Sequence, residues 1–332
     1  MEPVDRRDFI KTVAGTAAMA AADFKSTLGA EPANAASGSG GPVFLATWPH
    51  GKPAVDKAAE VFHSGGSLLD AVEKGINVPE DDPKVMSVGY GGLPNEQGVV
   101  ELDAAIMDGT RHRAGSICNL HMIKNPISVA RLVIEKTRHT TMAGEGAYQF
   151  ALKMGFKPMQ LLTPESLQKW LDWRAKPNHE TFWAVSADNH DTIGFVATDG
   201  KGHMVSGCST SGLAWKIPGR VADSPLVGCG VYANDSVGAA SATGDGDLMT
   251  NYCTSVSIVH MMARGLTPQA ACEELLHFMV KTDPANRTSE SAVIAMNNQG
   301  EIGAASMNAK FHLQYALWRN GESKMADSVV LY

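Results

Sequence analysis

The sequence predicts a mixed α+β protein in which sheets are layered and helices pack on their outer faces. Three observations lead to this prediction. Of the 332 residues, 44% are hydrophobic and 19% are charged, which provides ample apolar material for a large core. The 33 glycines and 16 prolines supply many turns. The expected elements follow in the order strand, helices, strands, and then hairpin, helices, strands.

The first half of the chain alternates short apolar runs with helical periodicity. An apolar run over 42–48 predicts a buried strand, and helical spacing predicts helices over 53–62 and 68–78, the second ended by Pro79. Thr163 provides a start signal for a later helix. The other expected elements are strands over 99–107 and 114–120 and helices over 127–136, 146–152 and 167–174.

A polar, turn-rich stretch over 176–191 separates the two halves and is expected to form a surface loop. Beyond it, apolar runs over 192–198 and 203–210 flank a turn and predict a hairpin. Thr267 is the expected cap of a following helix. The remaining predicted elements are helices over 248–263 and 268–280 and strands over 292–296, 302–306 and 312–318.

The first 35 residues resemble an export signal. Arg6 and Arg7 precede a short stretch of small and apolar residues, a pattern similar to a twin-arginine signal. Ala33 and Ala35 supply the small residues of a cleavage site. We therefore expect a signal peptide over 1–35 and an exported protein, periplasmic or extracellular. The alternative is an ordinary amphipathic N-terminal helix.

Charge and cysteine content exclude several classes of function. The 28 Lys and Arg against 35 Asp and Glu give a net charge of −7 without basic runs, which argues against a nucleic-acid partner. The five cysteines contain no CxxC pair, so they indicate neither a disulfide framework nor a zinc site. Phosphate-binding loops and the GxSxG motif of serine esterases are absent. We expect no metal, no cofactor and no membrane-spanning segment.

Residues that can carry chemistry are concentrated in the second half, where four short motifs follow one another. These are His190-Asp-Thr-Ile-Gly194, Thr210-Ser-Gly212, Pro218-Gly-Arg-Val-Ala-Asp-Ser-Pro225 and Thr243-Gly-Asp-Gly-Asp247. In this order and spacing they resemble the glycosylasparaginase (aspartylglucosaminidase) family, a type 2 asparaginase group of the N-terminal-nucleophile hydrolases. Further matching segments are Thr47-Trp48 and the stretches 80–83, 87–92, 102–108 and 124–131.

The resemblance implies a four-layer αββα sandwich and a precursor that cuts itself between Asp191 and Thr192. The Thr192 hydroxyl would attack the carbonyl carbon of Asp191, and water would hydrolyse the resulting ester. The products would be an α-chain half over 36–191 and a β-chain half over 192–332. These halves are expected to stay associated, and the family further implies a homodimer of αβ units.

The resemblance also implies hydrolysis of the amide between N-acetylglucosamine and asparagine in glycoasparagines. The freed α-amine of Thr192, with a reference pKa of about 7.7–8.0, would activate the hydroxyl of the same residue and allow a β-aspartyl ester to form. The other implied roles are Thr210 beside the nucleophile, Thr243 and Gly244 as oxyanion hole and substrate contacts, Arg220 for the substrate α-carboxylate, Asp223 for its α-ammonium group, and Trp48 and Ser87 near the substrate.

Several alternatives remain open. An isoaspartyl peptidase or plant-type L-asparaginase would share the fold, although those relatives usually carry Gly-Thr-Val-Gly where this chain has Asp191-Thr-Ile-Gly194. A remoter alternative is an inactive, exported glycan-binding homologue, which would stay uncut. For single residues, Arg220 could form a surface ion pair, Asp223 a cap, and Trp48 part of the core. Ser87 could be a loop hydroxyl.

Overall fold

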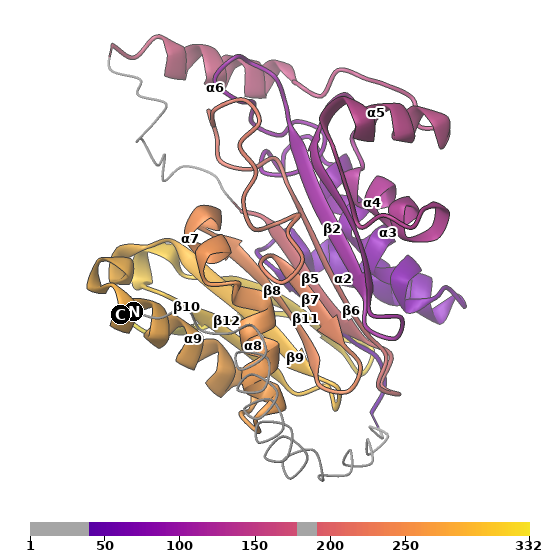
Figure 1. The fold of residues 1–332 in the computed structure, drawn as a ribbon, viewed down its shortest axis with the longest axis vertical. Coiled ribbons are helices and arrows are strands. Elements are labelled where there is room, and N and C mark those ends of the chain that lie inside the picture. The colour runs from indigo at the N-terminus through magenta and orange to yellow at the C-terminus, as the bar shows by residue number, and fades with distance from the viewer. Residues whose placement is uncertain (1–39, 178–190) are drawn as a thin grey trace, which may run out of the picture. The chain divides into compact units, whose positions relative to one another are not determined.

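The computed structural model describes residues 40–177 and 191–332. The predicted signal peptide over 1–35 and most of the polar loop over 176–191 lie outside the described residues. Two β-sheets pack face to face, and helices cover their outer faces (Figure 1). This arrangement confirms the predicted α+β class with its four layers, helix, sheet, sheet and helix.

The larger sheet has eight strands in the order β12-β11-β1-β5-β6-β2-β3-β4. Neighbouring strands are antiparallel except for the parallel pair β3 and β4. The strand bounds are β1 Val43–Thr47, β2 Leu102–Asp108, β3 Arg113–Leu120, β4 Thr141–Ala143, β5 Ile193–Thr198, β6 Met204–Thr210, β11 Gln314–Arg319 and β12 Glu322–Asp327. Strands from both sides of position 192 are therefore neighbours in this sheet, since β1 lies between β11 and β5, and β2 lies beside β6.

The smaller sheet has five strands in the order β13-β10-β9-β8-β7, and all of them come from the last third of the chain. Their bounds are β7 Val231–Asn234, β8 Gly238–Gly244, β9 Ser291–Asn297, β10 Ile302–Ser306 and β13 Val329–Val330. The two sheets approach closely where Gly194 of β5 faces β8. A Cβ atom at position 194 would lie 2.6 Å from the Ser241 hydroxyl oxygen, so a larger residue would push the sheets apart.

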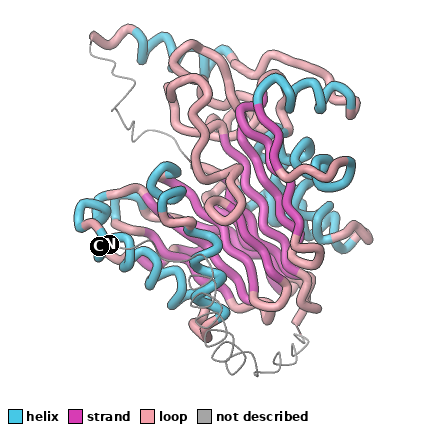
Figure 2. Tube along the Cα trace, viewed as in Figure 1, coloured by secondary structure: helices cyan, strands magenta, loops and turns pink. Residues whose placement is uncertain are grey.

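Helices form the two outer layers (Figure 2). On the larger sheet lie α2 Gly51–His63, α3 Leu68–Asp81, α4 Pro126–Lys136 and α5 Gly144–Lys153, and the smaller sheet is covered by α8 Thr254–Ala263 and α9 Pro268–Thr282. The shorter or outlying helices are α6 Pro164–Arg174, α7 Gly246–Asn251 and the 3₁₀ turns Pro284–Thr288 and Ala309–Phe311. Within the described part of the chain, no helix is long and apolar enough to cross a membrane.

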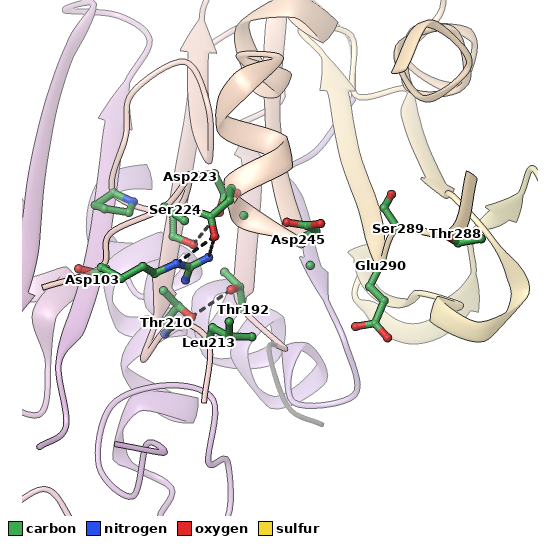
Figure 3. Close-up of a pocket in the computed structure, with 17 residues that line it drawn as sticks. Asp103, Thr192, Thr210, Leu213, Asp223, Ser224, Asp245, Thr288, Ser289 and Glu290 are labelled. Atoms are coloured by element: carbon green, nitrogen blue, oxygen red, sulfur yellow. Dashed lines mark hydrogen bonds and ion pairs between the residues drawn. The ribbon is translucent and has the colours of Figure 1, made fainter. Parts of the chain in front are cut away.

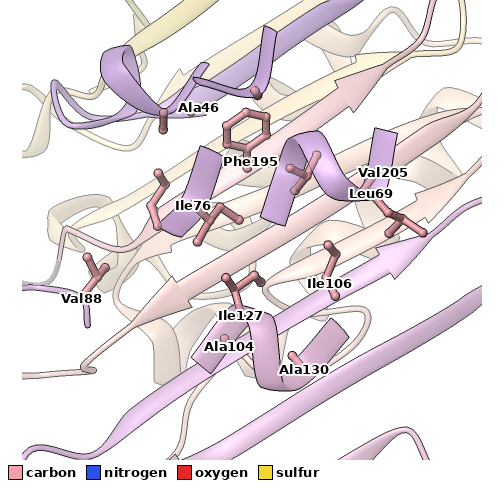
Figure 4. Packing of buried hydrophobic residues seen from close by; sticks show 14 of the residues in the cluster. Ala46, Leu69, Ile76, Val88, Ala104, Ile106, Ile127, Ala130, Phe195 and Val205 are labelled. Atoms are coloured by element: carbon pink, nitrogen blue, oxygen red, sulfur yellow. The ribbon is translucent and has the colours of Figure 1, made fainter. Parts of the chain in front are cut away.

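The hydrophobic core is divided among the layers. In Figure 4, Ile76 and Ile127 from the helices gather with Ile106 and Phe195 of the larger sheet, and all four side chains are completely buried. A second cluster fills the space between the sheets, and a third joins α8 and α9 to the smaller sheet. Burial on this scale is the main stabilising contribution to the fold.

Most predicted elements are confirmed, with two corrections to helices. Helix α3 does not end before Pro79 but includes it and ends at Asp81; the carbonyl oxygen of Pro79 accepts a hydrogen bond from the Asp82 N–H group. The single helix expected over 248–263 is wrong, because Cys253 adopts a left-handed conformation (φ 46°) that separates α7 from α8.

Five strands were not predicted: β4, β7, β8, β12 and β13. Strand β8 has the sequence GAASATG, which contains no aromatic residue and a single β-branched one, Thr243, so it lacks the composition that indicates a strand. Its side chains are small because the two sheets lie close together there. This closeness is a property of the tertiary structure that local sequence does not reveal.

Candidate active site

Three threonine hydroxyls from distant parts of the sequence meet at one end of the sheets. Strands β5 and β6 are antiparallel, so Thr192, just before β5, lies beside Thr210 at the end of β6. The Oγ1 of Thr192 donates a hydrogen bond to the Oγ1 of Thr210 at 3.0 Å (Figure 3). From the other sheet, Thr243 near the end of β8 brings its Oγ1 to 3.3 Å from the carbonyl oxygen of Thr192.

The main chain around Thr192 is held by two threonine side chains. The Oγ1 of Thr47, at the end of β1, donates to the carbonyl oxygen of Thr192 at 2.8 Å and accepts from the Gly194 N–H group at 2.8 Å. The Oγ1 of Thr243 donates to the same carbonyl oxygen. Thr192 is only 5% exposed. Its backbone position is thus fixed from both sheets, and Thr47 is a site residue whose role the sequence did not reveal.

The peptide bond between Asp191 and Thr192 is also held from its N-terminal side. The buried Ser87 donates its hydroxyl hydrogen to the carbonyl oxygen of Asp191 at 2.9 Å. The Thr210 hydroxyl, which accepts from Thr192, also accepts from the N–H group of Gly212 at 2.9 Å. Ser87 therefore contacts the bond expected to be cut.

Trp48 acts on this site through Thr243. Its indole Nε1 donates to the Thr243 Oγ1 at 2.9 Å, and its ring packs edge-on against Phe311 with centroids 5.0 Å apart. The residue is 8% exposed and does not line the cavity described below. In this structure Trp48 thus lies in the core and orients the Thr243 hydroxyl.

Thr192 opens onto a cavity of about 280 Å³ (Figure 3). Its walls come from the end of β6, the loop after it, the start of α7 and the segment 288–290. The lining residues are Asp103, Thr192, Thr210, Gly212, Leu213, Arg220, Ala222, Asp223, Ser224, Pro225, Gly244, Asp245, Gly246, Asp247, Thr288, Ser289 and Glu290. Among the residues described, no group of three or more His, Cys, Asp or Glu could hold a metal ion.

Arg220 brings a positive charge to the wall of the cavity. Its Nη2 and Nε lie 2.7 Å and 3.2 Å from the Oδ2 of Asp247, at the start of α7. The Asp247 side chain is 65% exposed, so a carboxylate that enters the cavity competes with a solvated partner. The guanidinium group is thereby held in place and remains available to a planar anion.

Asp223 lies on the same wall and is 4% exposed. Burial raises the pKa of its carboxyl group to about 7, although the nearby Arg220 charge acts in the opposite direction. Its Oδ2 is buried and has no hydrogen-bond partner among the described residues. A buried carboxylate with an unused oxygen suits a cationic ligand group, so the cavity offers one site for an anion and one for a cation.

Gly244 closes the cavity at the end of β8. Its φ of 112° disfavours any residue with a side chain, and an added Cβ atom would collide with the carbonyl oxygen of Glu290. That carbonyl accepts the N–H group of Asp245 at 2.7 Å. Glycine is therefore required for the main chain to turn from β8 into the cavity wall.

Two buried carboxylates, one behind the site and one on the cavity wall, were missed as site residues. Glu80, 0% exposed, accepts hydrogen bonds from Ser209 Oγ at 2.7 Å and from the Ile127 N–H group at 3.1 Å, and burial raises its pKa to about 7. It thereby fixes the residue next to Thr210. Asp103, on the cavity wall, lies 3.4 Å from the Nζ of the buried Lys216.

Glu80 and Asp103 both lie in segments that resemble the family, 80–83 and 102–108. No local sequence pattern, however, indicates which residues they contact. Glu80 is separated from Ser209 by 129 positions, and Asp103 from Lys216 by 113. Only the fold brings these groups together.

Comparison with known proteins finds one matching family model and several relatives with related names. The asparaginase family model (Asparaginase_2) matches residues 50–325. A protein of Elizabethkingia miricola named N(4)-(beta-N-acetylglucosaminyl)-L-asparaginase is 42% identical and aligns over 93% of this chain and 91% of its own. A Rattus norvegicus protein of the same name is 39% identical over 80% and 84%. A probable isoaspartyl peptidase/L-asparaginase 3 of Arabidopsis thaliana is 33% identical over 83% and 87%.

Proposed function

The chain belongs to the asparaginase family, and from this we propose that it is a self-processing glycosylasparaginase. It would cleave the amide bond between N-acetylglucosamine and the side chain of asparagine. The names of the bacterial and rat relatives support this activity. The observation that carries the proposal is the position of Thr192, which contacts the hydroxyl groups of Thr210 and Thr243 at a cavity with separate anion and cation sites.

The first step in the proposal is cleavage of the bond between Asp191 and Thr192. The Oγ1 of Thr192 attacks the carbonyl carbon of Asp191, the C–N bond breaks, and the α-amine is freed as an ester forms. Water then hydrolyses the ester. The hydrogen bond from Ser87 to the Asp191 carbonyl oxygen supports this step, because such a bond polarises the carbonyl group.

Cleavage would yield an α-chain half over 36–191, after removal of the signal over 1–35, and a β-chain half over 192–332. The halves would remain together, because β1 pairs with β5 and β11, and β2 pairs with β6. Strands from both halves would thus share one sheet. We include in the proposal export to the periplasm or cell exterior and a homodimer of αβ units.

Catalysis would then use both functional groups of the new N-terminal residue. The α-amine of Thr192 takes the hydroxyl proton as the oxygen attacks the side-chain carbonyl of the substrate asparagine. Thr243 and Gly244 stabilise the negative charge that develops on the carbonyl oxygen. The proton passes to the departing glycosylamine, a β-aspartyl ester remains on Thr192, and water releases aspartate.

Substrate selection would depend on the two charges in the cavity. Arg220 would bind the α-carboxylate of the asparagine, and Asp223 its α-ammonium group. Both groups are charged only when the asparagine is a free amino acid, so the enzyme would act on glycoasparagines after proteolysis of the protein chain. This recognition would also admit β-aspartyl compounds, which have the same charged end.

Replacing Arg220 by lysine is expected to weaken substrate binding more than self-cleavage. An ammonium group cannot provide two parallel hydrogen bonds to a carboxylate, and the loss of one charge-assisted bond corresponds to roughly a tenfold to hundredfold rise in KM. The measurement is steady-state kinetics with N-acetylglucosaminyl-asparagine, beside the fraction of cut chain on a denaturing gel. An unchanged KM would contradict the carboxylate role.

The raised pKa of Asp223 predicts that binding weakens at acidic pH. Only the ionised carboxylate pairs with an α-ammonium group, and with a pKa of about 7 this form is lost as the pH falls. The inhibition constant of the product L-aspartate should therefore rise about tenfold per pH unit between roughly pH 6.5 and pH 5. Asp223→Asn should bind weakly without this pH dependence; a wild-type constant that stays flat would contradict the role of Asp223.

The relative from Arabidopsis supports a second candidate, an isoaspartyl peptidase or L-asparaginase. The residues Asp191-Thr192-Ile193 favour the glycosylasparaginase group over it. Comparing aspartate release from N-acetylglucosaminyl-asparagine with that from a β-aspartyl dipeptide and from L-asparagine tests the choice. A higher kcat/KM for the dipeptide would select the second candidate. An uncut chain without amidase activity would select the inactive glycan-binding homologue.

A further inference from the structure

Two cysteines behind the cavity lie against the same carbonyl group. Cys229 belongs to the loop between Asp223 and β7, and Cys253 is the N-cap residue of α8. The Sγ atoms of both residues lie 3.8 Å from the carbonyl oxygen of Thr250. Both thiols are reduced in this structure. The two thiols also interact with each other directly, so their sulfur atoms are neighbours.

The main chain holds these two segments together. The carbonyl oxygen of Cys229 accepts hydrogen bonds from the Ser255 N–H group at 3.1 Å and from the Thr254 hydroxyl at 2.8 Å. The carbonyl oxygen of Gly228 accepts the N–H group of Val256 at 2.9 Å. The start of α8 is thereby fixed to the loop, so little chain entropy remains to be lost when the sulfur atoms join.

One member of the pair, Cys253, differs from the other cysteines in its access to solvent. Cys253 is exposed, whereas Cys118, Cys208 and Cys272 are buried. Cys229 is also buried, and this burial together with the neighbouring Cys253 thiol raises its pKa to about 12. Cys253 is therefore the thiol that an external reagent reaches first, and Cys229 lies behind it.

We propose that Cys229 and Cys253 form a redox-active pair that closes to an intramolecular disulfide when the protein meets a low-molecular-weight or protein disulfide. The sulfur of Cys253 attacks the external disulfide, releases one thiol and becomes a mixed disulfide. The sulfur of Cys229 then loses its proton to solvent, attacks the Cys253 sulfur and expels the second thiol. Two protein thiols are oxidised and one external disulfide is reduced to two thiols.

The bond would join two walls of the cavity. On one side, the carbonyl oxygen of Asp223 accepts the N–H groups of Leu226 and Gly230 at 2.8 Å and 2.9 Å, which connects it to the Cys229 loop. On the other side, Cys253 follows α7, whose Asp247 pairs with Arg220. The disulfide would thus hold the segment that carries Arg220 and Asp223 to α7, which carries Asp247, whatever substrate the cavity accepts.

The experiment oxidises the purified full chain with oxidised glutathione and then blocks free thiols with N-ethylmaleimide under denaturing conditions. Peptide mass spectrometry should find residues 229 and 253 linked, with the other three cysteines alkylated. The thermal midpoint of the oxidised protein should exceed that of the reduced protein by about 5 °C, because the bond closes a loop in the unfolded chain.

Two variants at the pair and one control variant make the result specific. Cys253→Ser should give neither the linked peptide nor the oxidation-dependent rise in midpoint, and Cys229→Ala should behave in the same way. Cys118→Ala, which removes a cysteine from β3, should retain both. The proposal is overturned if wild-type Cys229 remains alkylatable after oxidation, whether Cys253 is free or carries glutathione.

Discussion

Replacing Thr192 by alanine is expected to leave the chain uncut and to abolish amide hydrolysis. In the proposed mechanism the variant lacks the oxygen that attacks in both reactions, and without cleavage the α-amine proposed as the base is never freed. Loss of a nucleophile of this kind lowers the rate by roughly 10⁴-fold or more. Self-cleavage is read from a denaturing gel, and hydrolysis from aspartate released from N-acetylglucosaminyl-asparagine.

Thr198→Ala is the matched control for this variant. Thr198 lies at the other end of β5, is 1% exposed and does not line the cavity. The control makes the same chemical change in the strand that follows Thr192, so it should be cut normally and remain active. Efficient cleavage before position 192 in Thr192→Ala would show that another group performs the attack.

Thr243→Val is expected to lower kcat by about 10²–10³-fold while KM changes little. The substitution keeps the branched shape of the side chain and removes a single hydroxyl. A fall in kcat of about 10²–10³-fold is the range measured when one oxyanion-hole donor is lost. In this structure the hydroxyl already donates to a carbonyl oxygen, that of Thr192, so it is oriented for such a role. The measurement is steady-state kinetics on material shown to be fully cut.

The same substitution also leaves the Trp48 indole N–H group without its acceptor. Trp48→Phe separates the two effects, because it removes this N–H group and keeps the Thr243 hydroxyl. We expect a clearly smaller fall in kcat for Trp48→Phe than for Thr243→Val. Equal losses in the two variants would mean that the contact between them, rather than the hydroxyl acting on substrate, determines the rate.

Local sequence was sufficient for elements with a strong period or a clear cap. The strand over 42–48 and the helix after Thr163 were predicted nearly in full, because apolar runs and capping residues act within a few positions. It was insufficient for β8, whose small residues reflect the closeness of the two sheets. The break between α7 and α8 depends on the backbone of Cys253, which no neighbouring glycine or proline marks.

In the candidate site, too, the sequence predicted some features and missed others. The motifs predicted Thr192, Thr210, Arg220 and Asp223 as site residues, and the fold brings all four to a single cavity. What the motifs could not provide were contacts between distant residues, such as Arg220 with Asp247 and Glu80 with Ser209. These contacts arise from the packing of helices, loops and strands that are distant in the sequence, which local patterns do not encode.

The most direct test of the account is an intact-mass spectrum of the purified protein, with N-terminal sequencing and an activity assay on the same sample. We predict two associated fragments, one of which begins at Thr192 and the other of which ends at Asp191, together with release of aspartate from N-acetylglucosaminyl-asparagine. An active sample in which the bond before Thr192 is intact would contradict the account, because no free α-amine would then be present to activate the hydroxyl.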